Sequence, residues 1–162
     1  MSAYKINDKV MHFREGLSFI KEEKEMNGTS YFLVTVINGG ETIYVPTEKA
    51  DAIIRPIFPK EELPGLVVYM KTIRPDYFNN TKQRRDVFKK RLSSGDIKDL
   101  AYLTMQLYFF KRPEEVDTPV KFGPADVDML RYAAKTLFDE LALSLSKERS
   151  EVEEYIYALL KA

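Results

Sequence analysis

The hydrophobic pattern of this 162-residue chain changes its period once, near Pro56 to Pro64. Before that point, apolar and polar residues alternate in short runs, which is typical of strands; beyond it, apolar residues recur at helical spacing. Proline and charged residues mark the change, as they do at many domain boundaries. We therefore expect two domains, residues 1–56 and 57–162, and an α+β fold class in which a β domain precedes a helical one.

The first domain contains short runs rich in β-branched and aromatic residues, bounded by turn residues. Asn27-Gly28 and Asn38-Gly39-Gly40 are the clearest turns, because a tight hairpin between right-twisted strands needs positive φ angles. Several strands within so short a segment predict a small SH3-like β-barrel. The runs lie at residues 9–13, 16–20, 30–37 and 41–45.

The second domain is predicted to be all-α, with about five helices. Ser94-Gly95 can end one helix at a C-cap glycine, Asp96 can cap the next, and Pro124 suits a first helical position. The expected helices are 60–73, 79–94, 96–112, 124–145 and 147–161.

Composition excludes several classes of function. The chain has no cysteine, which rules out disulfides and thiolate chemistry and fits a reducing compartment. No run is apolar and long enough to span a membrane, and the N-terminus lacks a signal-peptide pattern. We expect a cytoplasmic protein with no membrane contact.

Positive charge is concentrated in one segment, although lysines plus arginines and aspartates plus glutamates are 25 each. The segment KQRRDVFKKR, from Lys82 to Arg91, has six basic residues and one acidic residue, Asp86. It largely lacks acidic partners at i,i+4, which would compete with phosphates for its cations. The segment is either a polyanion-binding face or an ordinary solvated helix surface.

Enzyme chemistry is poorly supported. The only histidine, His12, lies inside a strand-like run, where a structural role is the more common one. No nucleotide-binding glycine loop or nucleophile elbow occurs, and the glutamate clusters follow no calcium-loop pattern. We expect no catalytic residues, no cofactor and no metal.

Most aromatic residues of the first domain are needed for its core. An edge strand of that domain is better suited than its aromatic residues to binding a partner, because its unpaired backbone groups are open to a partner strand. Protein binding therefore suits this domain better than nucleic-acid binding.

Several blocks resemble the CarD/CdnL family of bacterial transcription regulators. The opening from Tyr4 to Gly16 is similar to the family's first strand and turn, and Thr42-Ile43-Tyr44-Val45-Pro46 resembles its hairpin ending in Val-Pro. In the helical part, Leu92-Ser93-Ser94-Gly95-Asp96 and Glu140-Leu141-Ala142 resemble its Leu-x-Ser-Gly-Asp and Glu-Leu-Ala stretches. The blocks keep their order over nearly the whole chain.

The resemblance implies a function. In that family a Tudor-like N-terminal domain, shared with transcription-repair coupling factors, binds the RNA polymerase β subunit. The helical domain contacts promoter DNA at the upstream edge of the melted bubble and stabilises the open complex. By hairpin position, the polymerase contacts carried over to this chain are Lys24, Met26 and Tyr44.

The chain departs from the family at three places. Thr81 stands where the family often has a tryptophan wedge, and Tyr77 or Phe78 could replace it or pack on the preceding helix. Tyr44 replaces a basic residue of the polymerase-binding strand. The segment 123–128 replaces a basic element that could contact phosphate.

We therefore expect a monomeric, CarD-like protein that binds the polymerase β subunit and contacts promoter DNA through its backbone, without reading bases. The alternative is a protein-protein adaptor that binds polymerase or an acidic protein and has no DNA role. The expected DNA-contacting residues are Lys82, Arg84, Arg85, Lys89 and Lys90, with Thr81 at the head of their helix.

Overall fold

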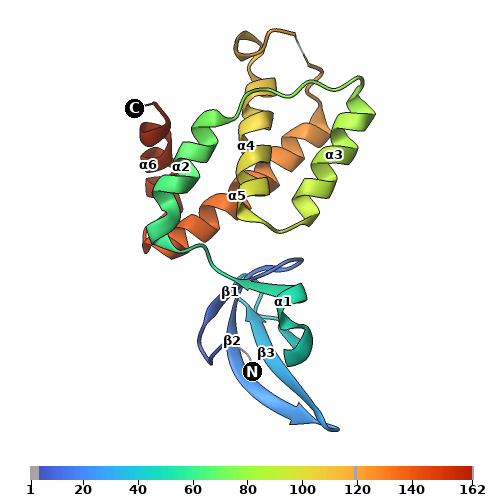
Figure 1. Ribbon diagram of the computed structural model, residues 1–162, viewed down its shortest axis with the longest axis vertical. Coiled ribbons are helices and arrows are strands. Elements are labelled where there is room, and N and C mark those ends of the chain that lie inside the picture. The colour runs from blue at the N-terminus through green and yellow to red at the C-terminus, as the bar shows by residue number, and fades with distance from the viewer. Residues whose placement is uncertain (1–3, 119, 162) are drawn as a thin grey trace. The chain divides into compact units, whose positions relative to one another are not determined.

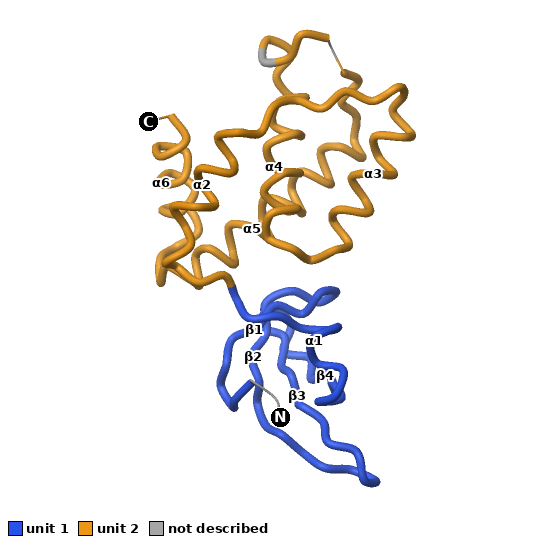
Figure 2. The backbone as a smooth tube through the Cα atoms, in the orientation of Figure 1, with its two compact units in different colours: residues 1–57 blue, residues 58–162 orange. Residues whose placement is uncertain are grey.

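A computed structural model describes residues 4–118 and 120–161 of the chain. The chain divides into two compact units, residues 1–57 and 58–162, drawn in different colours in Figure 2. Each unit has its own hydrophobic core.

Unit 1 is a five-stranded antiparallel sheet with the strand order β4-β3-β2-β1-β5. A short helix, α1 (Ala50–Ile53), follows β4 and leads into β5. The third residue of β5 is a proline, and so short a strand has no pattern of its own to predict it. The strands are β1 (Lys9–His12), β2 (Gly16–Met26), β3 (Thr29–Val36), β4 (Thr42–Pro46) and β5 (Ile54–Pro56).

The β2–β3 hairpin turns at the predicted Asn27-Gly28 pair. Both residues have positive φ angles, 50° and 80°, which asparagine and glycine tolerate better than other residues. The hairpin sets the register that follows, with Met26 opposite Thr29 and Lys24 opposite Tyr31. β2 is longer than predicted and carries an irregularity in its pairing between Ile20 and Glu22.

The core of unit 1 lies on one face of the bent sheet. It is made by alternate strand residues and by the short helix: Val10, Ile20, Phe32, Val34, Val45, Ala50 and Ile54. Period-two alternation places such residues on a common face. The predicted α+β class, a small Tudor-like β domain followed by helices, is confirmed.

Five α-helices form unit 2 in the part of the chain that is described (Figure 1). Their ends follow the predicted signals. Asp96 Oδ1 accepts a hydrogen bond from the Lys98 N–H at 2.9 Å, Gly95 has a φ of 72°, and Pro124 occupies the first turn of its helix. The helices are α2 (Leu63–Thr72), α3 (Thr81–Ser93), α4 (Ile97–Lys111), α5 (Pro124–Leu145) and α6 (Arg149–Lys161).

Helix α4 is the centre of unit 2. It packs against α2, α3 and α5, while α6 packs against α2 and α5. Leu100, Leu103 and Leu107 of α4 are almost completely buried with Phe88 of α3 and Leu137 of α5. Helix α3 is therefore an outer helix, attached by one face. None of the described helices is both long and apolar enough to cross a membrane.

Candidate nucleic-acid interface

Helix α3 starts at Thr81 because the preceding loop caps it. Asn80 Oδ1 accepts a hydrogen bond from the Gln83 N–H at 2.8 Å, and Gln83 Oε1 accepts one from the Asn79 N–H at 3.1 Å. This pair of reciprocal bonds satisfies amide groups that a helix start leaves open.

The outer face of α3 carries three exposed lysines, Lys82, Lys89 and Lys90. Lys82 Nζ lies 3.1 Å from Asp86 Oδ2, but the two side chains are 88% and 60% exposed, so the pair is weak and open to exchange. Lys89 and Lys90 form no salt bridge with any described residue. These two lysines are the cations most available to a phosphate.

Arg84 corrects the sequence prediction, because it is buried and cannot contact DNA from this position. It is 2% exposed, and its Nη2 lies 3.2 Å from Asp126 Oδ2 and 2.9 Å from the Lys121 carbonyl oxygen. Its guanidinium also lies 5.8 Å and 5.3 Å from the ring centroids of Phe88 and Phe110. Arg84 shares the inner face of α3 with Phe88, four residues along, as helical spacing requires.

Asp126 is the anchor that joins α3 to the start of α5. Burial alone would raise the pKa of its carboxyl, but the Gly123 N–H and the guanidiniums of Arg85 and Arg84 outweigh burial and lower this pKa. Arg85 Nη2 lies 3.3 Å from the same oxygen as Arg84 Nη2 and remains 33% exposed. Asp126 therefore binds both arginines. It lies in the segment 123–128, for which the sequence comparison indicated only that a basic element of the family is replaced.

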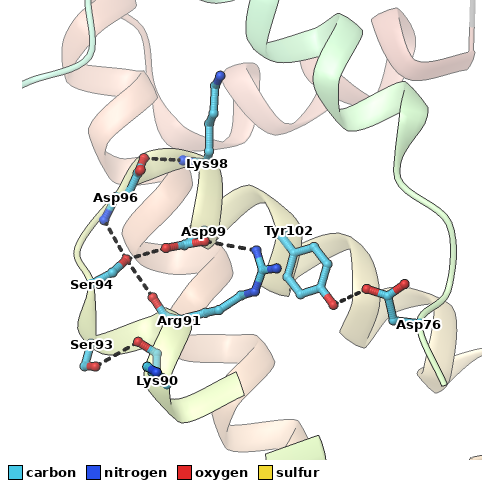
Figure 3. Close-up of polar contacts among 9 residues, drawn as sticks. All are labelled: Asp76, Lys90, Arg91, Ser93, Ser94, Asp96, Lys98, Asp99 and Tyr102. Carbon is cyan, nitrogen blue, oxygen red and sulfur yellow. Dashed lines mark hydrogen bonds and ion pairs between the residues drawn. The ribbon is translucent and has the colours of Figure 1, made fainter. Parts of the chain in front are cut away.

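Arg91 is also held internally. Its Nη1 lies 3.1 Å from Asp99 Oδ1, and its guanidinium lies 3.8 Å from the ring centroid of Tyr102 (Figure 3). Asp99 accepts a second hydrogen bond from Ser94 Oγ at 2.6 Å. Within the segment, Asp86 is the one acidic partner at i,i+4, as expected, but the arginines have partners from other helices: Asp99 of α4 and Asp126 of α5.

The loop before α3 is fixed by two buried side chains of α4. Gln106 donates a hydrogen bond to the Arg74 carbonyl oxygen at 2.7 Å and accepts one from the Asp76 N–H at 2.9 Å. The Tyr102 hydroxyl donates to Asp76 Oδ2 (Figure 3). Burial and this hydrogen bond raise the pKa of Tyr102, so the hydroxyl stays protonated as a donor.

At the head of α3, Thr81 is half-buried and offers no aromatic surface. Phe78 packs edge-on against Phe88 of α3, with ring centroids 5.7 Å apart. It thus has a packing contact with α3, whereas the packing weighed for it from the sequence was on the preceding helix. Tyr77 is 46% exposed, and its hydroxyl accepts a hydrogen bond from the Asp117 N–H at 2.8 Å. Tyr77 is thus the exposed aromatic of this loop.

In unit 1, the three predicted polymerase contacts lie on one face of the sheet, the face opposite the core. Lys24 pairs across the hairpin with Tyr31. Met26, two residues further along β2, lies on the same face of the sheet as Lys24. Tyr44, 47% exposed on β4, has its ring edge-on to Tyr31 with centroids 6.1 Å apart. β4 is an edge strand of the sheet. Tyr31 was missed, although the register of an Asn-Gly hairpin pairs it with Lys24.

His12 has a structural role in a turn. Its Nδ1 accepts hydrogen bonds from the N–H groups of Arg14 and Glu15, at 3.1 and 3.0 Å. Burial lowers the pKa of His12, with smaller effects from Glu15 and Arg14 that oppose and reinforce it respectively. The described residues contain no group of three or more metal-ligating side chains.

Comparison with known families covers both units. Residues 4–58 match the family model described as the CarD-like/TRCF RID domain, and residues 67–157 match the CarD C-terminal domain. A search of curated proteins gives no significant match. The two matches lie in the order and positions of the β unit and the helical unit, so the chain belongs to the CarD family, whose members are tied to interaction with RNA polymerase and to transcription regulation.

Proposed function

We propose that this protein binds the β subunit of RNA polymerase through unit 1 and contacts the promoter DNA backbone through α3, and so modulates the stability of the open complex. The observation that carries the DNA part is the outer face of α3, where Lys89 and Lys90 are exposed and have no carboxylate partner among the described residues. The role needs no catalytic group.

The contacts within unit 2 support a rigid presentation of these lysines. Arg84 and Arg91 hold α3 from its inner face, and Gln106 holds the loop that precedes it. Because the helix that carries these lysines is already held in place, it loses little conformational entropy when it binds. Tethering to polymerase also raises the effective concentration of the lysines near DNA. Weak, sequence-independent phosphate contacts are then sufficient.

The polymerase part rests on the edge strand β4 and the face beside it. β4 has one neighbour, β3, so its other edge is open to a partner strand. Tyr44, which is exposed, and Tyr31, which is half-buried, make an aromatic pair beside Lys24, so this face offers both apolar contact and charge. We propose that the polymerase β subunit adds a strand here and packs against this pair.

The test of the DNA role is the lifetime of an open complex on a defined promoter. The double variant Lys89→Glu/Lys90→Glu should abolish the protein's effect on this lifetime and leave polymerase binding intact. Lys147→Glu/Lys161→Glu is the matched control, because it makes the same charge change at two exposed lysines near α6. Equal effects of the two doubles would contradict the assignment of this face.

Recovery of the polymerase β subunit in a pull-down tests unit 1. Tyr44→Asp should reduce recovery strongly, whereas Lys9→Glu, an exposed change on β1, should not. Retained polymerase binding with no change in open-complex lifetime for the unmodified protein would favour the adaptor function over the DNA role.

A further inference from the structure

The turn between β1 and β2 depends on one side chain, that of His12. Its Nδ1 atom accepts hydrogen bonds from the backbone N–H groups of Arg14, at 3.1 Å, and Glu15, at 3.0 Å. His12 is 8% exposed, so water has little access to take the place of these bonds. A ring nitrogen accepts a hydrogen bond only while it carries no proton. The proton of the neutral imidazole therefore lies on Nε2.

The turn is short, and its residues are not part of the core of unit 1. Only residues 13–15 separate the two strands. The Phe13 N–H donates to the Ile53 carbonyl oxygen of α1 at 3.0 Å, whereas the other two N–H groups of this segment both depend on His12 Nδ1. Neither His12 nor any of these three residues belongs to the hydrophobic core cluster of unit 1. The turn can therefore open without disturbing that core.

His12 is held in its neutral state mainly by burial. Burial is the largest effect on the imidazole and lowers its pKa below the ordinary value of 6.5. Of its two charged neighbours in the turn, Glu15 raises this pKa, and Arg14 lowers it by a smaller amount. The closed turn thus binds a proton less readily than an exposed imidazole does, so it loses stability as the pH falls below about 6.5.

Charges on the neighbouring elements do not compensate a proton on His12. β2 has no charged residue over positions 16–20. Arg55 of β5 pairs with Met11, the residue before His12, so its side chain lies on the opposite face of the sheet. Asp51 is the one charged residue of α1, and it is exposed. Among the described residues, Glu15 is therefore the carboxylate that acts on the imidazole.

We propose that His12 is a pH-sensitive switch of the β1–β2 turn, which is closed when the imidazole is neutral and opens when Nδ1 takes up a proton from solvent. The protonated nitrogen is a donor, so the N–H groups of Arg14 and Glu15 lose their shared acceptor at the same time. A buried charge beside unpaired donors is costly, and residues 13–15 therefore leave the closed turn and expose the imidazolium to water. This opening does not rest on the polymerase or DNA roles proposed above.

The test is a pH titration of the full-length, ¹⁵N-labelled chain from about pH 7.5 to about pH 5, the range in which histidine titrates. At neutral pH the ring signals should report the Nε2–H tautomer. On acidification, the ring of His12 and the amides of Arg14 and Glu15 should shift with one common midpoint below 6.5. Hydrogen-exchange protection of these two amides, corrected for the intrinsic effect of pH, should fall about tenfold or more. Protection of the amide of Val34, in the core, should not change.

Two variants separate the switch from ordinary acid unfolding. His12→Asn places a side-chain oxygen near the position of Nδ1. This oxygen can accept the same N–H groups but does not titrate, so the turn should stay closed at the acid end of the titration. Glu15→Gln removes an exposed charge that favours the imidazolium, and it should move the midpoint to lower pH. Glu25→Gln, an exposed change at the other end of β2, is the matched control and should leave the midpoint unchanged.

Three results would overturn the proposal: an Nδ1–H tautomer at neutral pH, amide shifts that do not share the ring midpoint, or acid opening of His12→Asn equal to that of the unmodified chain. Equal midpoints for Glu15→Gln and Glu25→Gln would do so as well. Loss of Val34 protection at the same midpoint would show that unit 1 unfolds as a whole, which also contradicts a switch confined to the turn. The titration contains neither polymerase nor DNA, so its failure can be told apart from failure of the proposed function.

Discussion

The two faces of α3 carry the same kind of charge and use it differently. The inner face has arginines, Arg84 and Arg91, which contact carboxylates and aromatic rings. The outer face has lysines, Lys82, Lys89 and Lys90, which point into solvent. This division follows from chemistry, because a planar guanidinium can be buried against a carboxylate and stacked on rings, whereas an ammonium group keeps its water. A basic run in a sequence therefore overstates the charge available for binding.

The largest effect should come from removing the carboxylate on the inner side. Asp126→Ala leaves Arg84 buried without its partner, and breaking a buried pair in this way costs about 3–5 kcal/mol of unfolding free energy. Urea unfolding measures this loss. A cost below about 1 kcal/mol, the range of exposed pairs, would show that the inner arginine is no more structural than the outer lysines.

Arg84→Lys should be the next largest change, although it conserves charge. Lysine cannot make the two hydrogen bonds of Arg84 Nη2 together with the stacking on Phe88 and Phe110. We expect a loss of about 2 kcal/mol, within the usual range for a disrupted buried network. Lys89→Arg on the outer face, measured in the same urea series, is the matched control and should not change stability.

The pH dependence of stability should separate the faces as well. The pKa of Asp126 is lower in the folded protein than its ordinary value of 3.8. Its contribution is therefore complete above that value and is lost as the pH falls through the folded pKa. Asp126→Asn should flatten the acid limb of the stability curve below about pH 4, whereas Lys89→Ala on the outer face, which removes no carboxyl group, should leave the acid limb in place. Identical curves for Asp126→Asn and the unmodified protein would contradict the assigned role of Asp126.

The smallest effect on stability is expected at the outer face. Lys89→Ala/Lys90→Ala should change the unfolding free energy by less than about 0.5 kcal/mol, as at most exposed sites. The same double should lower the slope of log affinity against log salt for DNA by about 2, since each phosphate that a lysine no longer neutralises lowers it by about 0.9. A slope equal to that of the unmodified protein would remove these lysines from the interface.

Local signals in the sequence predicted most of the fold. Asn27-Gly28, Gly95-Asp96 and Pro124 each act within a few residues, so the hairpin and the helix ends follow from them. β5 was missed because it has three residues and is ordered by pairing with β1, more than 40 positions earlier.

The candidate site was predictable only in part, because its partners are distant in sequence. The Arg84–Asp126 pair spans 42 residues, so nothing beside Arg84 indicates that it is buried. The helical period of α3 does place residue 84 on the same face as Phe88, and this spacing could have indicated that Arg84 faces the core. Lys89 and Lys90 stay exposed because the same period turns them away from the core.

The hydrogen bonds of Gln106 also restrict changes in chain length. One side chain holds the Arg74 carbonyl and the Asp76 N–H, two residues apart, so an inserted residue between them would separate the two groups from their single partner. The residues of the turn at Gly39-Gly40 are exposed, and among the described contacts no buried side chain holds their backbone groups. Among related sequences, we expect insertions and deletions to accumulate at that turn and to be excluded from residues 74–76.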